Sequence, residues 1–294
     1  MEAVFRTADT FPGLHARVPA AWTAFWNDPA QNRCASGAPE IWQALEGHWS
    51  TFAHSLAPGA RVLDLGCGAG AVARQLLRAC TSISVTGIDF ARLPLTIRPR
   101  VELLSDTAME SLPFPEHSFD AAVSQFGFEY SDTVRAAKEM ARVLAPGAKI
   151  SFIVHHAGSG VVQASRARLD ALRMILSTTT GAAFCAGDVT AFDAQMRALL
   201  RQHRGDPLAL ELARSLPSRL QRTHRERVAI WKAIGEALVP ERCISECLAS
   251  SCVAAPRVGE WLEPLRAVCD LAPVVMLREP SGVPIAWRVE GVRR

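Results

Sequence analysis

Residues 61–71, with the sequence RVLDLGCGAGA, constrain the fold of this chain more than any other stretch. Val62 to Leu65 is a short apolar run typical of a buried strand, and Val72 to Ala79 is compatible with a helix. Between them stand three glycines at every second position, Gly66, Gly68 and Gly70. Glycine accepts positive φ and has no Cβ, so such a turn brings backbone close to a ligand, and the next helix offers free N–H groups. The stretch therefore predicts a strand, a turn and a helix that bind a nucleotide.

Two acidic residues narrow the kind of nucleotide. Gly66, Gly68 and Ala71 also satisfy the G-x-G-x-x-G/A fingerprint, so a nicotinamide or flavin enzyme is an alternative. Asp64, however, lies two places before the first glycine, and Asp89 closes the next apolar run, SISVTGID. A carboxylate at the end of that second strand can hold both hydroxyls of a ribose.

These motifs resemble those of a known family. VLDLGCGAG resembles motif I of class I S-adenosylmethionine-dependent methyltransferases, and Asp89 resembles their ribose-binding acid. ESLPFPEHSFDAAVSQF and EMARVLAPGAKISFI are similar to the third, fourth and fifth strand regions of the ubiquinone and menaquinone biosynthesis-like branch. The resemblance covers about Ala57 to His156 and implies S-adenosylmethionine as the cofactor.

The order of elements predicts an α/β fold. Strand-like runs alternate with helical segments from Arg61 to His155, which argues for a doubly wound, mostly parallel sheet wrapped by helices. A short helix is expected near Ala91 to Ile97. Strand character returns only at Ala272 to Leu277 and Pro284 to Val292, which we interpret as strands six and seven of a seven-stranded Rossmann-like methyltransferase sheet, the last antiparallel.

The same reading predicts four parts in the chain. They are an N-terminal helical cap (1–57), a cofactor-binding core (58–157), a helical insertion or lid between strands five and six (158–270) and the final two strands (271–294). In the first part, apolar residues from Ile41 to Ala53 recur at spacings of three and four, so Pro39 to Leu56 is predicted to be an amphipathic helix. Such a helix either covers the cofactor or simply packs on the core.

The resemblance implies the residues that hold the cofactor, at the carboxyl ends of the strands. The family usually has an acid two residues before the E of E-x-L-P-F, where this chain has Ala108, and Asp106 is a weaker substitute. Phe128 is a further candidate beside the methyl donor, with core packing as the alternative. The expected cofactor-binding residues are Asp64, Gly66, Cys67, Gly68, Gly70, Asp89, Phe90, Ala108, Met109, Gln125 and Phe126.

Three residues are expected to act on the acceptor. Tyr130, the only tyrosine, is predicted to face the substrate. His155 and His156 end the fifth strand, and an imidazole that titrates near neutrality can remove a proton from a hydroxyl nucleophile. Methyl transfer from a sulfonium otherwise needs alignment and exclusion of water more than catalytic side chains.

Composition sets the broad class of protein. A net charge of +3 gives no argument for a nucleic-acid partner, although eight of the 29 arginines lie between Arg197 and Arg227. That segment is either a solvated helical face or a docking face for RNA or protein. The eight cysteines form no C-x-x-C pair, so no metal is expected. No run is long enough to span a bilayer and MEAVFRTADTF lacks signal-peptide order, so a cytoplasmic location is the default.

The sequence therefore predicts methyl transfer from S-adenosylmethionine to an oxygen, nitrogen or carbon atom of a small molecule. The alternatives are an RNA or protein methyltransferase that uses the arginine-rich segment, a nicotinamide-dependent oxidoreductase, and a cofactor-binding module without catalysis. The acceptor and the oligomeric state are not readable from these residues.

Overall fold

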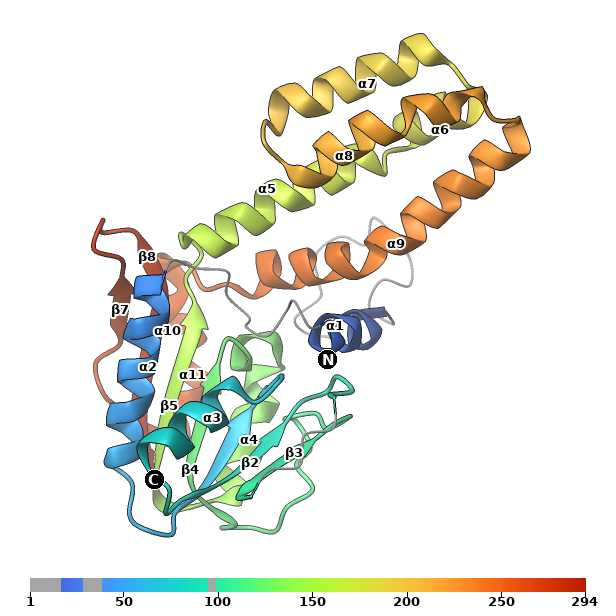
Figure 1. The fold of residues 1–294 in the computed structure, drawn as a ribbon. Helices are drawn as coiled ribbons and strands as arrows, with labels where there is room; N and C mark the ends of the chain where they lie inside the picture. The colour runs from blue at the N-terminus through green and yellow to red at the C-terminus, as the bar shows by residue number, and fades with distance from the viewer. Residues whose placement is uncertain (1–16, 29–38, 95–98) are drawn as a thin grey trace. The chain divides into compact units, whose positions relative to one another are not determined.

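The computed structural model describes residues 17–28, 39–94 and 99–294 (Figure 1). Cys34, residues 1–16 and residues 95–97 of the helix expected at 91–97 lie outside these ranges. The strands are β1 (Arg61–Leu65), β2 (Ser84–Ile88), β3 (Val101–Leu104), β4 (Phe119–Gln125), β5 (Leu144–His155), β6 (Cys269–Leu271), β7 (Val275–Arg278) and β8 (Pro284–Arg293). The helices are α1 (Val18–Asn27), α2 (Pro39–His54), α3 (Ala71–Ala79), α4 (Thr133–Val143), α5 (Gly160–Ile175), α6 (Thr178–Ala186), α7 (Val189–Gln202), α8 (Pro207–Ser215), α9 (His224–Ser251), α10 (Val258–Trp261) and α11 (Glu263–Arg266).

One sheet organises the core, with the strand order β3-β2-β1-β4-β5-β8-β6 and β7 paired with β8. The pairs β1 with β2, β2 with β3, β1 with β4 and β4 with β5 are parallel, whereas β8 runs antiparallel to β5. The order reverses between β1 and β4, so the switch point of the sheet lies where the glycine turn leaves β1. The predicted doubly wound fold with an antiparallel last strand is confirmed.

The predicted sixth strand differs from the observed one. In place of a single strand from Ala272 to Leu277, two short segments, β6 and β7, pair antiparallel with β8, and the register is offset by one residue between them. Pro273 lies in the interruption, where its missing N–H prevents a continuous ladder. The sheet therefore has eight strands where the sequence predicted seven.

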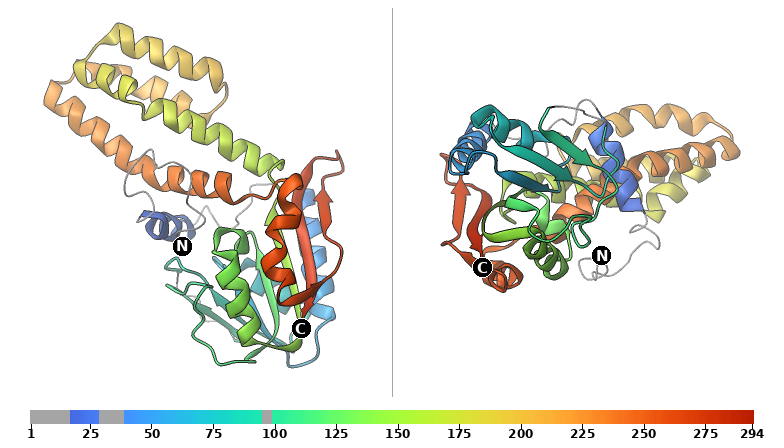
Figure 2. Two further views of the ribbon diagram at one scale, coloured as in Figure 1. Left: turned by 180° about the vertical axis from the view of Figure 1, so that it is seen from behind. Right: turned by 90° about the horizontal axis from the view of Figure 1, so that it is seen from below.

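Each face of the sheet is covered by its own hydrophobic core, because successive strand residues point to opposite faces. On β4, Ala121 and Val123 join the core beneath α2 and α3, while Ala122 joins the core beneath α4 and α11. Figure 2 shows these helices on the two sides of the sheet. The apolar face of α2, including Leu45 and Trp49, is buried in the first core, so packing explains its aromatic stripe.

The helical insertion lies between β5 and β6, as predicted. By its contacts the chain divides into a core unit, made of the described residues up to Gln163 with Cys247–Arg294, and a helical unit, Ala164–Glu246. The helical unit has its own hydrophobic core, in which α6, α7 and α8 contribute Phe184, Phe192 and Leu212. The longest helix of the described chain, α9, begins in the helical unit at His224 and ends at Ser251.

The short helix expected near Ala91 to Ile97 is wrong for the part that the structure describes. Residues 91–94 are not helical. The N–H of Arg92 donates to Oγ1 of Thr23 and the N–H of Leu93 donates to Oγ of Ser105, both at 2.9 Å. Pro94 also disfavours helical backbone at the preceding residue.

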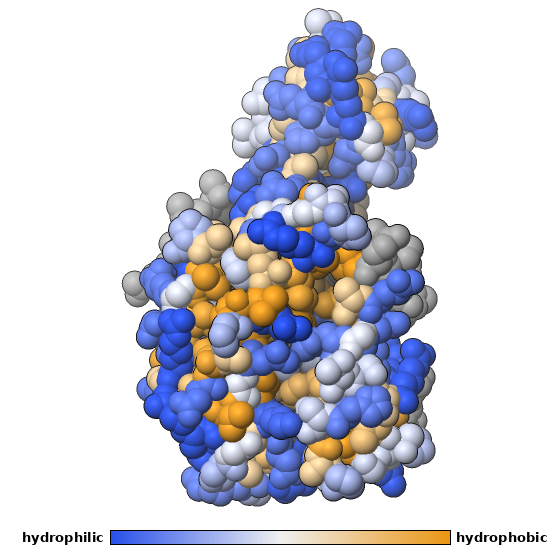
Figure 3. All heavy atoms as spheres, turned by 90° about the vertical axis from the view of Figure 1, so that its left-hand side faces the viewer, coloured by the Kyte–Doolittle hydropathy of each residue, from blue (hydrophilic) through white to orange (hydrophobic). Residues whose placement is uncertain are grey.

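The side of the core unit that carries α2, β7 and β8 has hydrophobic as well as hydrophilic surface (Figure 3). Val275, Val283 and Val292 are exposed on β7, β8 or the turn between them. Single exposed valines are ordinary on protein surfaces.

Within the described ranges, no helix combines the length and the apolar character needed to cross a membrane.

Candidate functional site

The glycine turn after β1 is built as the sequence predicts. Gly66, Gly68 and Gly70 adopt φ values of 70°, 49° and 74°, a region that disfavours other residues. The N–H groups of Gly66 and Cys67 both donate to the carbonyl of Ile88 at 2.9 Å, which ties the turn to the end of β2. A Cβ at Gly66 would lie 3.0 Å from Cα of Gly127, so the turn also packs closely on the end of β4.

Asp89 follows β2 and holds the glycine turn directly. Its Oδ2 accepts a hydrogen bond from the N–H of Gly68 and its Oδ1 from the N–H of Ala91, both at 2.9 Å. The residue is 5% exposed, and burial raises the pKa of its carboxyl to about 6 against the opposing effect of the two amides. Each carboxylate oxygen has a second lone pair, so Asp89 can still accept hydrogen bonds from ligand hydroxyls.

Asp64, on β1, is a buried carboxylate without a partner. It is 1% exposed, and neither oxygen forms a hydrogen bond with any described residue. Burial and then the negative charge of Asp89 raise the pKa of Asp64 to about 7, and the N–H of Ala73 opposes this rise without forming a hydrogen bond. An unpaired buried carboxylate is costly, so this site favours a cationic ligand.

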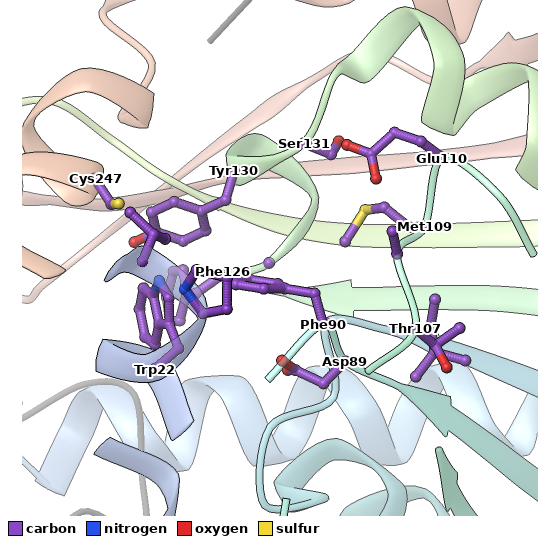
Figure 4. A pocket seen from close by; sticks show the side chains of 16 residues that line it. Trp22, Asp89, Phe90, Thr107, Met109, Glu110, Phe126, Tyr130, Ser131 and Cys247 are labelled. Carbon is purple, nitrogen blue, oxygen red and sulfur yellow. The ribbon is translucent and has the colours of Figure 1, made fainter. Parts of the chain in front are cut away.

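Two cavities lie at this edge of the sheet. The larger, of about 500 Å³, is bordered by Asp89, and the smaller, of about 30 Å³, by Asp64. Gly66 and Phe126 border both cavities. Figure 4 shows the aromatic side chains of Trp22, Phe126 and Tyr130 on one side of the larger cavity. The larger cavity is the size of a small-molecule site with apolar walls and a few polar groups.

The structure brings most of the predicted cofactor residues to these cavities. Asp89, Phe90, Ala108, Met109, Gly66 and Phe126 line the larger one, and Asp64, Cys67, Gln125, Gly66 and Phe126 line the smaller one. Gly68 and Gly70 border neither: Gly68 lies against Trp26, and Gly70 is the N-cap of α3. The side chain of Asp106 is 63% exposed and pairs with Arg92, away from both linings. Phe128 is fully buried and stacks on Phe152, which agrees with the alternative that this residue packs in the core.

Of the three residues expected to act on the acceptor, only Tyr130 borders the larger cavity. The ring of His155 stacks on Phe126 with centroids 4.1 Å apart, and Phe126 lines the cavity. His156 packs against Trp287, its Nδ1 accepts from the N–H of Gly158 at 2.8 Å, and burial and Arg278 lower its pKa. Both histidines are therefore absent from the cavity lining, and their catalytic roles stay predictions.

Glu129 fixes the position of His155 by two hydrogen bonds. Oε1 of Glu129 accepts hydrogen bonds from the backbone N–H and from Nδ1 of His155, both at 2.8 Å. The other ring nitrogen of His155, Nε2, is buried and has no hydrogen-bond partner among the described residues. Phe126 adopts φ 57°, an unfavourable conformation for a non-glycine residue. The Glu129 and His155 pair thus supports a strained aromatic residue that borders both cavities.

Replacing Glu129 with glutamine is expected to lower the free energy of unfolding by about 1–2 kcal/mol. The amide oxygen can still accept from His155, but the new NH₂ group would lie where Oε2 has no described partner. Urea denaturation measures the change, with Glu260→Gln as the control because Glu260 pairs with Arg257 and both side chains are about three-quarters exposed. Equal losses in the two variants would contradict this account of the buried pair.

Several residues of the site were missed by the sequence reasoning. Trp22 and Trp26 come from α1, Thr107 and Glu110 from the segment after β3, and Cys247 from α9. The spacing of Val18, Ala21, Trp22 and Phe25 is helical and was a usable signal for α1. Nothing in the sequence indicates that Cys247 lies beside Tyr130, as Figure 4 shows.

Comparisons with known proteins agree with this site. Residues 63–152 match the family model described as "Methyltransferase domain". The chain is 38% identical over 99 residues to the demethylmenaquinone methyltransferase of Thermus thermophilus, covering 31% of this chain and 44% of that protein. It is 32% identical over 123 residues to a ubiquinone/menaquinone biosynthesis C-methyltransferase of Geotalea daltonii, covering 37% and 52%. The chain thus spans about half the length of the curated relatives it matches.

A solved structure shows the same fold. The N-methyltransferase NodS of Bradyrhizobium japonicum, in complex with S-adenosylhomocysteine, aligns with a TM-score of 0.50 over 94% of this chain and 98% of that chain. Its sequence identity is 12%, so this likeness concerns the fold alone. The glycine turn, the two buried acids and the match of residues 63–152 to a methyltransferase domain agree, and the core of this chain is similar to class I S-adenosylmethionine-dependent methyltransferase domains.

Proposed function

We propose that this chain transfers a methyl group from S-adenosylmethionine to a small-molecule acceptor. The observation that carries the proposal is the pair of buried acids on either side of the glycine turn. Asp64 has no partner within the described chain, and Asp89 is fixed by Gly68 and Ala91 with lone pairs to spare. These residues fit the two ends of the cofactor, because an ammonium group suits Asp64 and ribose hydroxyls suit Asp89.

The cofactor supplies a sulfonium-activated methyl group, and the residues of this chain orient the reactants. Asp64 would hold the ammonium and Asp89 the ribose, so the bound nucleoside would have a fixed direction across the carboxyl edge of the sheet. Phe126 borders both cavities, and Trp22 and Tyr130 add aromatic surface that excludes water. Methyl transfer converts the sulfonium to a neutral thioether, and a neutral hydroxyl, N–H or ring C–H acceptor releases one proton; Tyr130, which lines the larger cavity, is the expected residue nearest to that step.

The walls of the larger cavity support an apolar, ring-shaped acceptor. Val18, Pro19, Trp22 and Tyr130 line it, and aromatic rings favour offset or edge contacts with other rings. The relatives from Thermus and Geotalea are named for demethylmenaquinone and for ubiquinone and menaquinone biosynthesis. We therefore propose a reduced quinone or a similar aromatic ring as the class of acceptor.

The arginine-rich segment gives no support to the RNA or protein alternative. Arg197 pairs with Asp193 on its own helix, Arg222 pairs with Glu226 at the start of α9, and Arg227 donates to backbone carbonyls of the helical unit. Such pairs are usual on a solvated helical surface. Methylation of RNA or protein and a cytoplasmic location stay predictions of the sequence.

The experiment has two steps. Isothermal titration with S-adenosylhomocysteine tests cofactor binding, and the same titration with NADH tests the oxidoreductase alternative. Transfer of labelled methyl from S-adenosylmethionine to a chemically reduced demethylnaphthoquinone then tests the acceptor class. We expect binding of S-adenosylhomocysteine, no heat with NADH, and labelled product that grows with enzyme concentration. Binding without transfer would reject the acceptor class, and absence of binding would reject the function.

A further inference from the structure

Trp26 lies directly on the glycine turn. A Cβ built on Gly68 would be 2.4 Å from Cζ2, 2.6 Å from Cη2 and 2.7 Å from Cε2 of the Trp26 indole. The backbone of Gly68 therefore faces a side chain from α1 where a glycine turn of this kind normally faces its ligand. Trp26 belongs to α1, an N-terminal helix that precedes the strands of the sheet and the helices that connect them.

The same indole borders only one of the two cavities. Trp26 borders the smaller cavity, which contains Asp64, and is absent from the lining of the larger cavity, which contains Asp89. Only about 30 Å³ is open beside Asp64, which is space for about one water molecule. One ligand that reaches both carboxylates must pass the Gly66 to Gly68 backbone, and Trp26 covers Gly68.

The described hydrogen bonds that hold α1 here are at the surface, whereas Val18, Ala21 and Trp22 are buried and the ring of Trp22 meets that of Tyr130. Oγ1 of Thr23 accepts from the N–H of Arg92 at 2.9 Å, and Nδ2 of Asn27 donates to the carbonyl of Arg92 at 3.0 Å, both as exposed hydrogen bonds. Trp26 also stacks on Trp22 with ring centroids 6.2 Å apart. Exposed hydrogen bonds contribute little net free energy, so a ligand with modest differential affinity can displace them.

We propose that Trp26 is an access-controlling residue, which occupies in the cofactor-free protein the surface of Gly68 that S-adenosylmethionine takes when it binds. This inference rests on the proposed function. Movement of the indole joins the two cavities into one site that reaches from Asp64 to Asp89. The apparent affinity for the cofactor is then the intrinsic affinity reduced by the fraction of molecules in which Trp26 is displaced.

Removal of the indole should therefore strengthen binding, whereas removal of an ordinary binding residue weakens it. We expect Trp26→Ala to bind S-adenosylhomocysteine about tenfold more tightly than the wild type, with Trp26→Phe in between. In stopped-flow fluorescence, the observed rate should level off with ligand concentration in the wild type and stay proportional to it in Trp26→Ala. Thr23→Val loosens α1 without changing Trp26 and should shift binding in the same direction.

The chain offers a matched control. Trp231, in the helical unit, lies on Gly181 in the same way, with Nε1 2.6 Å from a Cβ built there. Trp231→Ala is expected to leave the affinity and the association kinetics unchanged. If the wild type binds S-adenosylhomocysteine, and Trp26→Ala and Thr23→Val bind it with unchanged or weaker affinity, the inference is overturned. If neither the wild type nor any variant binds S-adenosylhomocysteine, the proposed function itself fails.

Discussion

Asp89→Ala is expected to weaken the binding of S-adenosylhomocysteine by at least about 100-fold, which corresponds to about 3 kcal/mol. Hydrogen bonds to a charged acceptor are worth about 1.5–3 kcal/mol each, and the ribose offers two donors. The substitution also removes the acceptor for the N–H groups of Gly68 and Ala91, so the glycine turn loses its fixed position. Isothermal titration at pH 8, above the raised pKa of about 6, measures the loss with the wild-type carboxyl ionised.

Asp106→Ala is the matched control for Asp89→Ala. Asp106 is an acid of the same neighbourhood, expected from the sequence as a weaker substitute for the adenine contact, but its side chain is exposed and pairs with Arg92. Its removal should change the affinity by less than about threefold, because exposed ion pairs contribute little. If Asp106→Ala were the more damaging variant, the cofactor would lie differently from the arrangement proposed here.

The glycine turn and Asp89 were predictable because their geometry is set by local sequence. Three alternating glycines impose positive φ, and an acid at the end of the next parallel strand must lie at the same edge of the sheet. The strand register pairs Leu65 with Ile88, which places Gly66 beside Asp89. Short-range rules and one topological rule were therefore enough for this half of the site.

The histidines show where such rules stop. That His155 ends β5 follows from the pattern, but its contacts depend on Phe126 and Glu129, which come from the end of β4 and the turn after it. The positive φ of Phe126 and the stacking of its ring place it at the cavity and leave His155 out of the lining. A residue's position at a strand end thus predicts proximity to the site, and side-chain packing decides whether it borders the cavity.

The cover of the site depended on long-range contacts that no local pattern carries. The helical spacing in α1 is visible in the sequence, yet its place over Gly68 is set by Thr23 and Asn27 meeting the backbone of Arg92. Cys247 reaches the cavity from the C-terminal part of α9, more than a hundred residues along the chain from Tyr130. Likewise, Pro273 marks a break in an edge strand, but the one-residue offset between β6 and β7 is visible only in their pairing with β8.

Asp64→Asn is expected to change how the stability of the cofactor-free protein depends on pH. In the folded protein the pKa of Asp64 is raised to about 7, whereas an unfolded chain gives it an ordinary value of about 3.9. Between these values the folded state binds more protons than the unfolded state, so the Asp64 contribution to stability falls as pH rises from about 4 to about 7. Above pH 7 the buried charge costs on the order of 4 kcal/mol.

Urea denaturation at pH 5, 6, 7 and 8 measures this dependence. The asparagine variant keeps the shape of the side chain without its charge, so its stability should fall less than that of the wild type over this range. Asp89 titrates in both proteins, and the difference between the two curves therefore reports the ionisation of Asp64 together with its repulsion of Asp89. Parallel curves would mean that Asp64 is not a buried carboxylate with a raised pKa.

The same series performed with saturating S-adenosylhomocysteine links the stability cost to function. An ammonium beside Asp64 favours the ionised form, so the ligand should lower the pKa of Asp64 and stabilise the wild type most at pH 8. The affinity of the wild type should accordingly rise as pH increases through about 7, and this rise should be absent in Asp64→Asn. A carboxylate that destabilises the empty protein and binds the cofactor's cation would explain why β1 keeps a buried acid without a partner.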